Sequence, residues 1–261
     1  MENIITNFYK NIKVSEQRNI ITIQLYRPEA NNSINGFLIK ELMMVLVQIE
    51  SNPEIKVVVL EGLPDVFCSG MDFKTIYKND SESLIGDDPN KYYDLLKHFS
   101  LCSKIIVAKV EGKVNAGGIG LVAVSDIVIA DEKATFGLSE VLFGLLPACV
   151  IPFLIRRVGY QKAQWMTLIS QGISAERAHQ IGLVDEVSTN VNEVVRKNLL
   201  RLTKLETDTI KDLKDYMSKL WIINQQTQQL AVDKIYSLLN TEKVQTNISN
   251  FVENGKFPWD K

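Results

Sequence analysis

The sequence predicts an α/β fold whose core is followed by a helical C-terminal region. Short apolar segments typical of buried strands alternate with segments of helical periodicity over most of the chain. After Thr189 the strand-like segments end, and apolar residues recur at helical spacing through about Leu239. We therefore expect a core that holds the functional site over residues 1–190 and a helical region over residues 191–261.

The composition is that of an ordinary globular chain with a substantial core. Of the 261 residues, 46% are hydrophobic and 23% are charged, enough for one large domain or a domain with an appendage. The formal net charge is −2. Because nucleic-acid binding normally shows as clustered surplus lysine and arginine, we expect small-molecule or protein partners and no nucleic acid.

The cysteines and the apolar runs indicate a cytoplasmic protein. Cys68, Cys102 and Cys149 are odd in number and form no CxxC pair, so neither a disulfide framework nor a zinc site is predicted. The N-terminus lacks a basic segment followed by an apolar one, and no apolar run approaches the roughly 18 residues that span a bilayer. We expect no membrane association.

The first elements are a strand, a helix and a second strand. Residues 19–26 are rich in β-branched residues and end at a polar turn, which predicts a strand. Apolar residues from Ile34 to Ile49 follow one helix face, with Ser33 as the expected N-cap. Residues 56–61 form a continuous apolar run of the kind that is buried on both faces.

The second strand is followed by a glycine-containing turn and a polar loop. Gly70 follows Phe67-Cys68-Ser69 where a helix could begin, although an ordinary turn also explains it. Residues 78–91 are polar and turn-prone, which predicts a surface loop before a helix over residues 92–101. That loop could cover a site or be plain surface. Residues 105–110 are a further apolar strand.

The glycine-rich stretch from Gly112 to Asp126 is the strongest candidate for a ligand site. It joins the strand at 105–110 to an apolar helix, and Gly117, Gly118 and Gly120 leave its backbone bare. A helix that begins there directs unpaired N–H groups and the positive end of its dipole at an anion. Close packing or a tight turn would also account for the glycines. Neither a Walker loop nor a full dinucleotide fingerprint is present.

Glu140 is the anomaly of the next segment, which follows an apolar strand over residues 127–130. It is the only carboxylate between Glu132 and Glu176, and its apolar surroundings predict burial. Burial raises the pKa of a carboxyl, which gives an acid or base that works near neutral pH. The alternative is a structural ion pair with Arg156 or Arg157.

Three helices follow, at residues 150–158, 161–169 and 174–182, the last with a serine N-cap and a glycine stop. The two histidines, His98 and His179, lie in polar helical contexts without a partner at metal-ligand spacing. We expect solvated or locally bonded imidazoles. A metal site and a Ser-His-Asp triad both lack their parts.

Three segments in order resemble motifs of the crotonase (enoyl-CoA hydratase/isomerase) superfamily. They are Phe67-Cys68-Ser69-Gly70-Met71-Asp72, Val110 to Gly118, and Phe136-Gly137-Leu138-Ser139-Glu140, and residues 173–187 also look like the family. The resemblance covers nearly the whole chain and is specific in combination. It implies a crotonase fold, a spiral of ββα turns with a C-terminal helical region, that acts on thioesters as a homotrimer or a dimer of trimers.

The resemblance also implies site residues. By motif position, the backbone N–H groups of Met71 and Gly117 form the oxyanion hole for the thioester carbonyl, and Glu140 is the catalytic carboxylate. Hydratases of this family use two glutamates, but the first of the two positions falls on Gly120 here. A single Glu140 could remove the α-proton and pass it to a departing hydroxyl, and isomerases that move one proton also need one carboxylate.

The likeness is greatest to the dehydrating members of polyketide β-branching cassettes. It lies in residues 112–120, 139–157 and 255–259. The implied enzyme is a carbon–oxygen lyase that dehydrates 3-hydroxy-3-methylglutaryl on an acyl carrier protein to 3-methylglutaconyl. The substrate would be carried as a phosphopantetheine thioester, with no permanently bound cofactor and no metal. The alternatives are a hydratase or isomerase of free acyl-CoA and an inactive crotonase-like scaffold subunit.

The sequence leaves open which group helps the hydroxyl depart. Asp72, Lys113, Asn115 and Tyr77 are unranked candidates, because each lies in or near one of the motifs. Asp72 is better explained as the N-cap of the helix that follows it.

Overall fold

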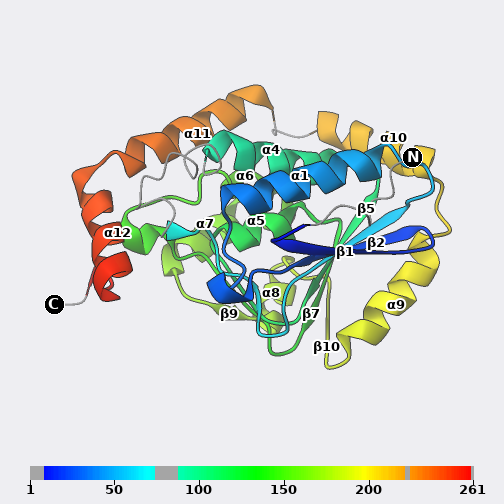
Figure 1. The fold of residues 1–261 in the computed structure, drawn as a ribbon, viewed down its shortest axis with the longest axis horizontal. Coiled ribbons are helices and arrows are strands. Elements are labelled where there is room, and N and C mark those ends of the chain that lie inside the picture. Colours follow the sequence, from blue (N-terminus) through cyan, green and yellow to red (C-terminus); the bar gives the residue numbers. More distant parts are fainter. Residues whose placement is uncertain (1–8, 74–87, 221–223, 260–261) are drawn as a thin grey trace.

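A computed structural model describes residues 9–73, 88–220 and 224–259. Its core contains two sheets packed with helices, and further helices extend from the core toward the C-terminus (Figure 1). Among the described residues the larger sheet has the spatial order β1 (Ile12–Gln17), β2 (Ile20–Leu25), β3 (Val57–Glu61), β5 (Ile105–Val110), β7 (Ile127–Asp131) and β10 (Glu186–Ser188). Only β1 pairs antiparallel; the other neighbours in this sheet are parallel.

A smaller sheet accompanies the larger one. In the described residues its order is β4 (Val66–Cys68), β6 (Lys113–Asn115), β8 (Thr135–Gly137) and β9 (Ile173–Ser174). The chain alternates between the sheets, because β3 leads to β4, β5 to β6, and β7 to β8. A helical segment follows each of these pairs. This repeat is the spiral of ββα turns that the resemblance implies.

The central strands are fixed by burial. Side chains of the two central strands are fully buried: Val57, Val58 and Leu60 of β3, and Ile106 and Val107 of β5. Parallel strands buried on both faces are rich in valine and isoleucine, since branched side chains pack well on a pleated surface.

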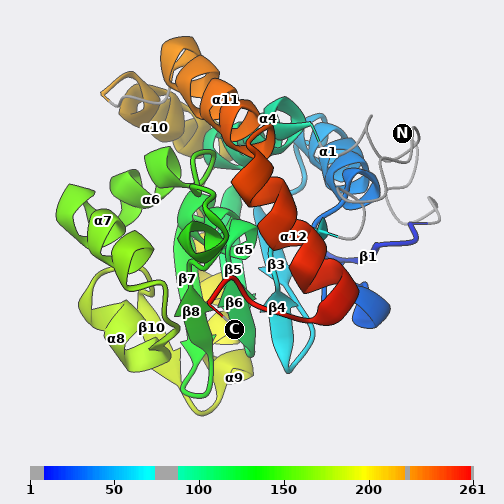
Figure 2. The same ribbon diagram turned by 90° about the vertical axis from the view of Figure 1, so that its left-hand side faces the viewer.

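The helices cover the sheets and form the C-terminal region. Those of the core are α1 (Gly36–Glu50), α4 (Pro89–Leu101), α5 (Gly117–Val124), η3 (Glu140–Phe143), α6 (Ile151–Val158), α7 (Tyr160–Ile169) and α8 (Ala175–Gln180). A short η2 (Pro28–Ala30) precedes α1. The C-terminal helices are α9 (Val191–Leu202), α10 (Thr207–Lys219), α11 (Gln225–Leu239) and α12 (Glu242–Asn254). Figure 2 shows α12 crossing the face of the molecule, and the Asn247 side chain of α12 donates to the Phe143 carbonyl of η3 at 3.2 Å.

Most predicted elements are confirmed, with corrections at their ends. Asn35, not Ser33, caps α1, since its side chain accepts a hydrogen bond from the Leu38 N–H at 2.9 Å. The helix predicted at 92–101 begins at Pro89, because Asp88 caps it through the Asn90 N–H. A short strand, β6, lies between β5 and the glycine-rich helix. The edge strand β1 was not predicted. The division at residue 190 stays a prediction.

Within the described residues, no helix is both long and apolar enough to cross a membrane.

Candidate active site

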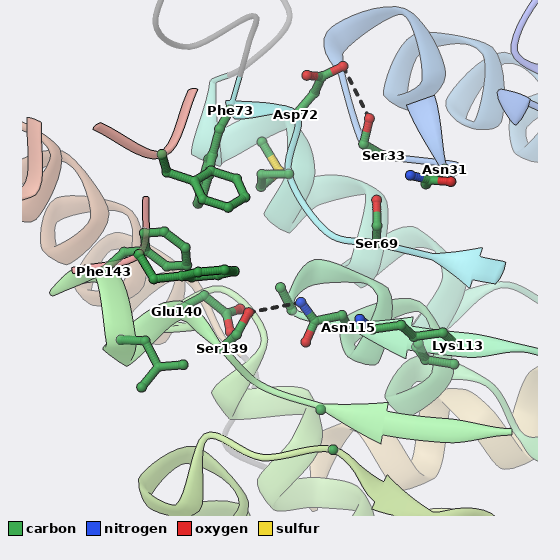
Figure 3. Close-up of a pocket in the computed structure, with 18 of the residues that line it drawn as sticks. Asn31, Ser33, Ser69, Asp72, Phe73, Lys113, Asn115, Ser139, Glu140 and Phe143 are labelled. Atoms are coloured by element: carbon green, nitrogen blue, oxygen red, sulfur yellow. Dashed lines mark hydrogen bonds between the residues drawn. The ribbon is translucent and has the colours of Figure 1, made fainter. Parts of the chain in front are cut away.

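A cavity of about 900 Å³ lies between the small sheet, η3 and the C-terminal end of the chain. Figure 3 shows its two kinds of wall. Polar residues line one part, among them Asn31, Ser69 and Lys113, and aromatic rings line another, including Phe73 and Phe143. Glu140 and Ser139 lie between them. Such a mainly apolar cavity with a few convergent polar groups is the usual form of a small-molecule site.

The first wall is built by the turn after β4. Ile34 bridges Met71 in parallel fashion: the Ile34 N–H donates to the Gly70 carbonyl at 2.7 Å, and the Asp72 N–H donates to the Ile34 carbonyl at 2.9 Å. In this pattern Ile34 uses the groups of Gly70 and Asp72, so the N–H of Met71 itself points away from Ile34. Gly70 has φ +97°, a conformation that suits glycine and strains other residues.

A buried ionic cluster fixes this turn from behind. The Arg27 guanidinium donates to the Asp72 carboxylate at 3.1 Å and also to the Ser33 carbonyl. The Ser33 hydroxyl donates to the same Asp72 carboxylate at 3.1 Å (Figure 3). Asp72 and Ser33 flank the bridged pair Met71 and Ile34, so the cluster holds both chains in register. The predicted capping role of Asp72 concerns residues that lie outside the described ones.

The second wall is the junction between β6 and α5. Ala116 has φ 49° and ψ −122°, a strained conformation for a residue with a Cβ. Its N–H donates to the Gly137 carbonyl at 2.9 Å. Gly117 begins α5 and its N–H is one of the first-turn groups without an intrahelical acceptor, and no side chain caps the helix. This junction therefore presents bare N–H groups, as the glycine-rich sequence predicts.

The two walls meet at their glycines. A Cβ placed on Gly70 would lie 2.6 Å from the Ala116 Cβ and 3.5 Å from the Gly117 nitrogen. Met71 and Ala116 line the cavity, and Gly117 follows Ala116 directly. One repeat of the ββα spiral separates these residues in the sequence, and the parallel pairing of β4 with β6 brings them together.

Glu140 lies in the same cavity, at the start of η3. One of its carboxylate oxygens, Oε2, is buried and accepts no hydrogen bond from the described residues. Burial raises the pKa of Glu140 from 4.5 to about 7, although the backbone N–H groups of Glu140 and Ser139 act in the opposite direction. A carboxyl with this pKa can both accept and return a proton near neutral pH. An acid in a cavity whose pKa is strongly shifted is typical of a functional site, so Glu140 marks this cavity as a candidate.

The ion-pair alternative for Glu140 is wrong. Arg156 donates to the Ser100 hydroxyl and to the Val124 carbonyl at 3.4 Å. Arg157 pairs with Asp185 and donates to the Ser125 carbonyl at 2.9 Å. Both arginines therefore join secondary-structure elements to one another, and neither pairs with the Glu140 carboxylate.

Other predicted polar residues divide between the cavity and the rest of the fold. Lys113 and Asn115 both line the cavity, and the Asn115 side-chain amide donates to the Ser139 hydroxyl at 2.8 Å (Figure 3). Tyr77 lies outside the described residues. His98 and His179 bond locally, to the carbonyls of residues 94 and 184, as predicted.

The described residues contain neither a disulfide nor a cluster of side chains suited to a metal ion. The three cysteines are free and buried. No group of three or more histidine, cysteine, aspartate or glutamate side chains in the described ranges could hold a metal ion.

The sequence did not reveal the aromatic wall. Phe73 contacts Phe143 with ring centroids 5.3 Å apart, Phe143 contacts Phe251 at 5.3 Å, and Phe251 contacts Phe257 at 5.2 Å. These rings come from the turn after β4, from η3, from α12 and from the tail. No local pattern joins positions so distant, and only the fold shows that the C-terminal end completes the cavity.

The architecture and the site define the class of protein. The family model for enoyl-CoA hydratase/isomerase matches residues 15–261, and this chain belongs to that family. The predicted crotonase fold is thereby confirmed, as is the predicted enzyme class, a hydro-lyase of the enoyl-CoA hydratase/isomerase type.

One similar protein is the bacillaene synthase dehydratase PksH of Bacillus subtilis, which is 43% identical over 97% of both chains. Its solved structure, described as a putative polyketide biosynthesis enoyl-CoA hydratase, superposes with a TM-score of 0.90 over 96% of this chain and 100% of that one. The 2,3-dehydroadipyl-CoA hydratase of Escherichia coli is 33% identical over 67% of this chain and 68% of that protein.

Proposed function

We propose that this enzyme dehydrates a 3-hydroxy-3-methylglutaryl thioester on an acyl carrier protein to 3-methylglutaconyl-ACP, as a step of polyketide β-branching. The relationship to PksH, a dehydratase of bacillaene synthase that matches over 97% of the chain, supports a dehydratase role in polyketide biosynthesis. The resemblance in the glycine-rich and Glu140 motifs supports the particular acyl group and carrier.

The reaction needs two functions of the site. The thioester oxygen accepts hydrogen bonds from the N–H groups of Met71 and Gly117, which stabilise the negative charge that develops as the α-proton leaves. The Glu140 carboxylate takes that proton. The electron pair of the broken C–H bond forms the α,β double bond, the β-hydroxyl departs, and the proton on Glu140 completes the water molecule. Losing one such backbone donor typically costs about 3–4 kcal/mol in the transition state.

The observation that carries the proposal is the state of the Glu140 carboxylate. It lies in the cavity with a buried Oε2 that no described side chain or N–H engages, and burial raises its pKa to about 7. A structural carboxylate is normally paired when it is buried, because an uncompensated charge is costly. An unpaired acid beside two bare backbone junctions is what a one-carboxylate elimination requires.

The charge of the cavity favours a carrier-borne substrate over free coenzyme A. Lys113 is the single cation among the described lining residues, against three carboxylates, Glu29, Asp72 and Glu140. Coenzyme A brings a diphosphate and a 3′-phosphate, whereas a phosphopantetheine arm brings one phosphodiester. Phosphate groups are normally bound by several cationic donors. One lysine is sufficient for the arm alone.

The test compares the same acyl group on two carriers. The purified enzyme is incubated with the 3-hydroxy-3-methylglutaryl thioester of acyl carrier protein and, separately, of coenzyme A. The mass of each product is measured by mass spectrometry. We expect loss of one water and no loss of carbon dioxide, at least about 10-fold faster on the carrier protein. Faster turnover of the coenzyme A thioester would establish the free acyl-CoA enzyme instead, and no turnover of either would establish a scaffold.

We also propose a homotrimer or a dimer of trimers. The exposed face of α10 supports it, because Leu213, Tyr216 and Met217 are 57–61% exposed there. Apolar side chains that gather on one helix face are typical of a subunit contact. Native mass spectrometry should give three or six copies, and a monomer would contradict the assembly.

A further inference from the structure

Tyr92 occupies a place in the structure that its sequence context does not predict. It lies on α4, it is 4% exposed, and its hydroxyl donates a hydrogen bond to the Gly117 carbonyl. The neighbouring Tyr93 is equally buried, but its hydroxyl has no partner among the described residues. Of these two adjacent tyrosines, only Tyr92 is bonded to the glycine-rich junction.

The Tyr92 hydroxyl also fills the space beside Gly120. A Cβ placed on Gly120 would lie 2.4 Å from the Tyr92 oxygen and 3.0 and 3.2 Å from the two Cδ atoms of Leu96. Real Cβ atoms do not approach other atoms to 2.4 Å. The ring cannot easily yield, because it is buried and its hydroxyl is held by the Gly117 carbonyl.

Gly117 is held from two directions. On one side, the Ala116 N–H is tied to the Gly137 carbonyl at 2.9 Å. On the other side, the Gly117 carbonyl accepts from Tyr92. The peptide that carries the Gly117 N–H lies between these two anchors, and its own carbonyl, that of Ala116, accepts from the Ile119 N–H at 2.9 Å. Glycine has no side-chain restraint of its own, so this orientation depends on these hydrogen bonds, of which only the one from Tyr92 is donated by a side chain.

We infer that Tyr92 is a positioning residue that fixes the Gly117 N–H for the thioester oxygen and keeps residue 120 without a side chain, so that the site works with one carboxylate. The first half of this inference rests on the proposed function. The second half concerns packing alone. A glutamate at position 120, as in a two-carboxylate hydratase, cannot be accommodated while the Tyr92 hydroxyl is present.

The electrostatic setting agrees with this role. Burial raises the pKa of Tyr92 well above its usual value, and the nearby Cys68, Cys149 and Glu140 act in the same direction. This direction favours the protonated phenol, which is the form that donates to the Gly117 carbonyl.

The first experiment removes the Tyr92 hydroxyl alone. Tyr92→Phe keeps the ring, and Tyr93→Phe, which deletes a buried hydroxyl without a described partner, is the matched control. With the acyl-carrier substrate, we expect kcat of Tyr92→Phe to fall about 10-fold while KM changes less than about 3-fold, since orientation and not binding is lost. Tyr93→Phe should keep the parent kcat. Equal kcat values for the two variants would overturn the positioning role.

The second experiment needs no substrate, so it separates this inference from the proposed function. Gly120→Ala is made in the parent and in Tyr92→Phe, and Gly172→Ala, whose Cβ would meet nothing within 4 Å, is the control. We expect Gly120→Ala to lower Tm by about 4 °C or more in the parent and by less than half as much in the Tyr92→Phe protein. An equal loss in both backgrounds would show that Tyr92 does not close position 120.

Discussion

The two walls of the cavity are built from different parts of the polypeptide. On one wall, Met71 and Ala116 line the cavity, and their backbone is held by the bridge to Ile34, by an ionic cluster and by the junction that begins α5. On the other, Phe73, Phe143 and Phe251 line the cavity with side chains that pack against one another, and Figure 3 shows Phe73 and Phe143 there. A backbone wall cannot be altered by changing its own side chains, whereas the aromatic wall consists of them.

This difference assigns separate tasks to the walls. Under the proposed function, the N–H groups and the acid stabilise charge that exists only in the transition state, so we expect them to govern kcat. We expect the apolar rings to contact the acyl group equally in the ground state and the transition state, and therefore to govern KM. Changes on the two walls should therefore separate in kinetic measurements.

The largest effect is expected from Glu140→Gln, which keeps the shape of the side chain but removes its ability to accept a proton. A positioned acid–base group contributes about 10²–10⁴-fold, so kcat should fall by that factor. In the parent, kcat should rise with pH through about 7, because the base is the ionised form and the pKa of Glu140 is raised to that value. The residual rate of the variant should not follow this profile. Parent-like turnover by Glu140→Gln would refute its catalytic assignment.

The next largest effect is expected from Gly70→Ala, which disturbs the backbone wall without removing a functional group. The new Cβ would lie 2.6 Å from the Ala116 Cβ, at a residue with φ +97°. The turn must shift and move the Met71 N–H, so kcat should fall by roughly 10²–10³-fold, as for loss of one oxyanion donor.

Stability measurements accompany this comparison. The strained φ should also cost about 1–3 kcal/mol, seen as a lower denaturation midpoint. Gly159→Ala is the control for both readings, because Gly159 has φ +80° and a Cβ there would meet nothing within 4 Å; it should lower the midpoint and keep the parent kcat. An unchanged kcat in a folded Gly70→Ala protein would show that the turn does not position the oxyanion.

A smaller effect, on the other kinetic constant, is expected from Phe251→Ala. Phe251 contacts Phe143 and Phe257, and it lines the cavity. Losing an aromatic contact of about 1 kcal/mol corresponds to roughly a 5-fold rise in KM, with kcat within about 2-fold of the parent. Phe37→Ala, an exposed phenylalanine on α1 that is 58% accessible, should change neither constant. A fall in kcat alone would contradict the division between the walls.

The same division explains how much of the molecule the sequence could predict. Strands β3 and β5 are evident because parallel strands buried on both faces form continuous apolar runs. The edge strand β1, Ile12–Gln17, alternates polar and apolar residues and is half exposed, so its signal is weak. Asn35 replaces Ser33 as the cap of α1 because the tertiary bridge to Met71 takes up Ile34 and delays the helix.

The candidate site follows the same logic. Gly117 and Glu140 stand out in the sequence because bare glycines and a lone carboxylate in apolar surroundings are locally unusual. Phe251 and Tyr92 do not stand out, since an aromatic residue on an amphipathic helix is ordinary. Their importance arises from the neighbours that tertiary packing brings to them, and a pattern along the sequence does not predict those neighbours.

The remaining expected effect is on stability and not on turnover, and it tests whether the Glu140 acid lacks a partner. Its pKa is raised from 4.5 to about 7, so the folded protein holds this proton more tightly than the unfolded chain does. The resulting stabilisation is fully present below pH 4.5 and is lost as pH rises through about 7. Glu140→Gln has no such loss. Its Tm relative to the parent should therefore be higher at pH 8 than at pH 4.5, by thermal unfolding in both buffers. A difference that does not vary with pH would show that the carboxylate is compensated in the folded protein, and the one-acid elimination would lose its base.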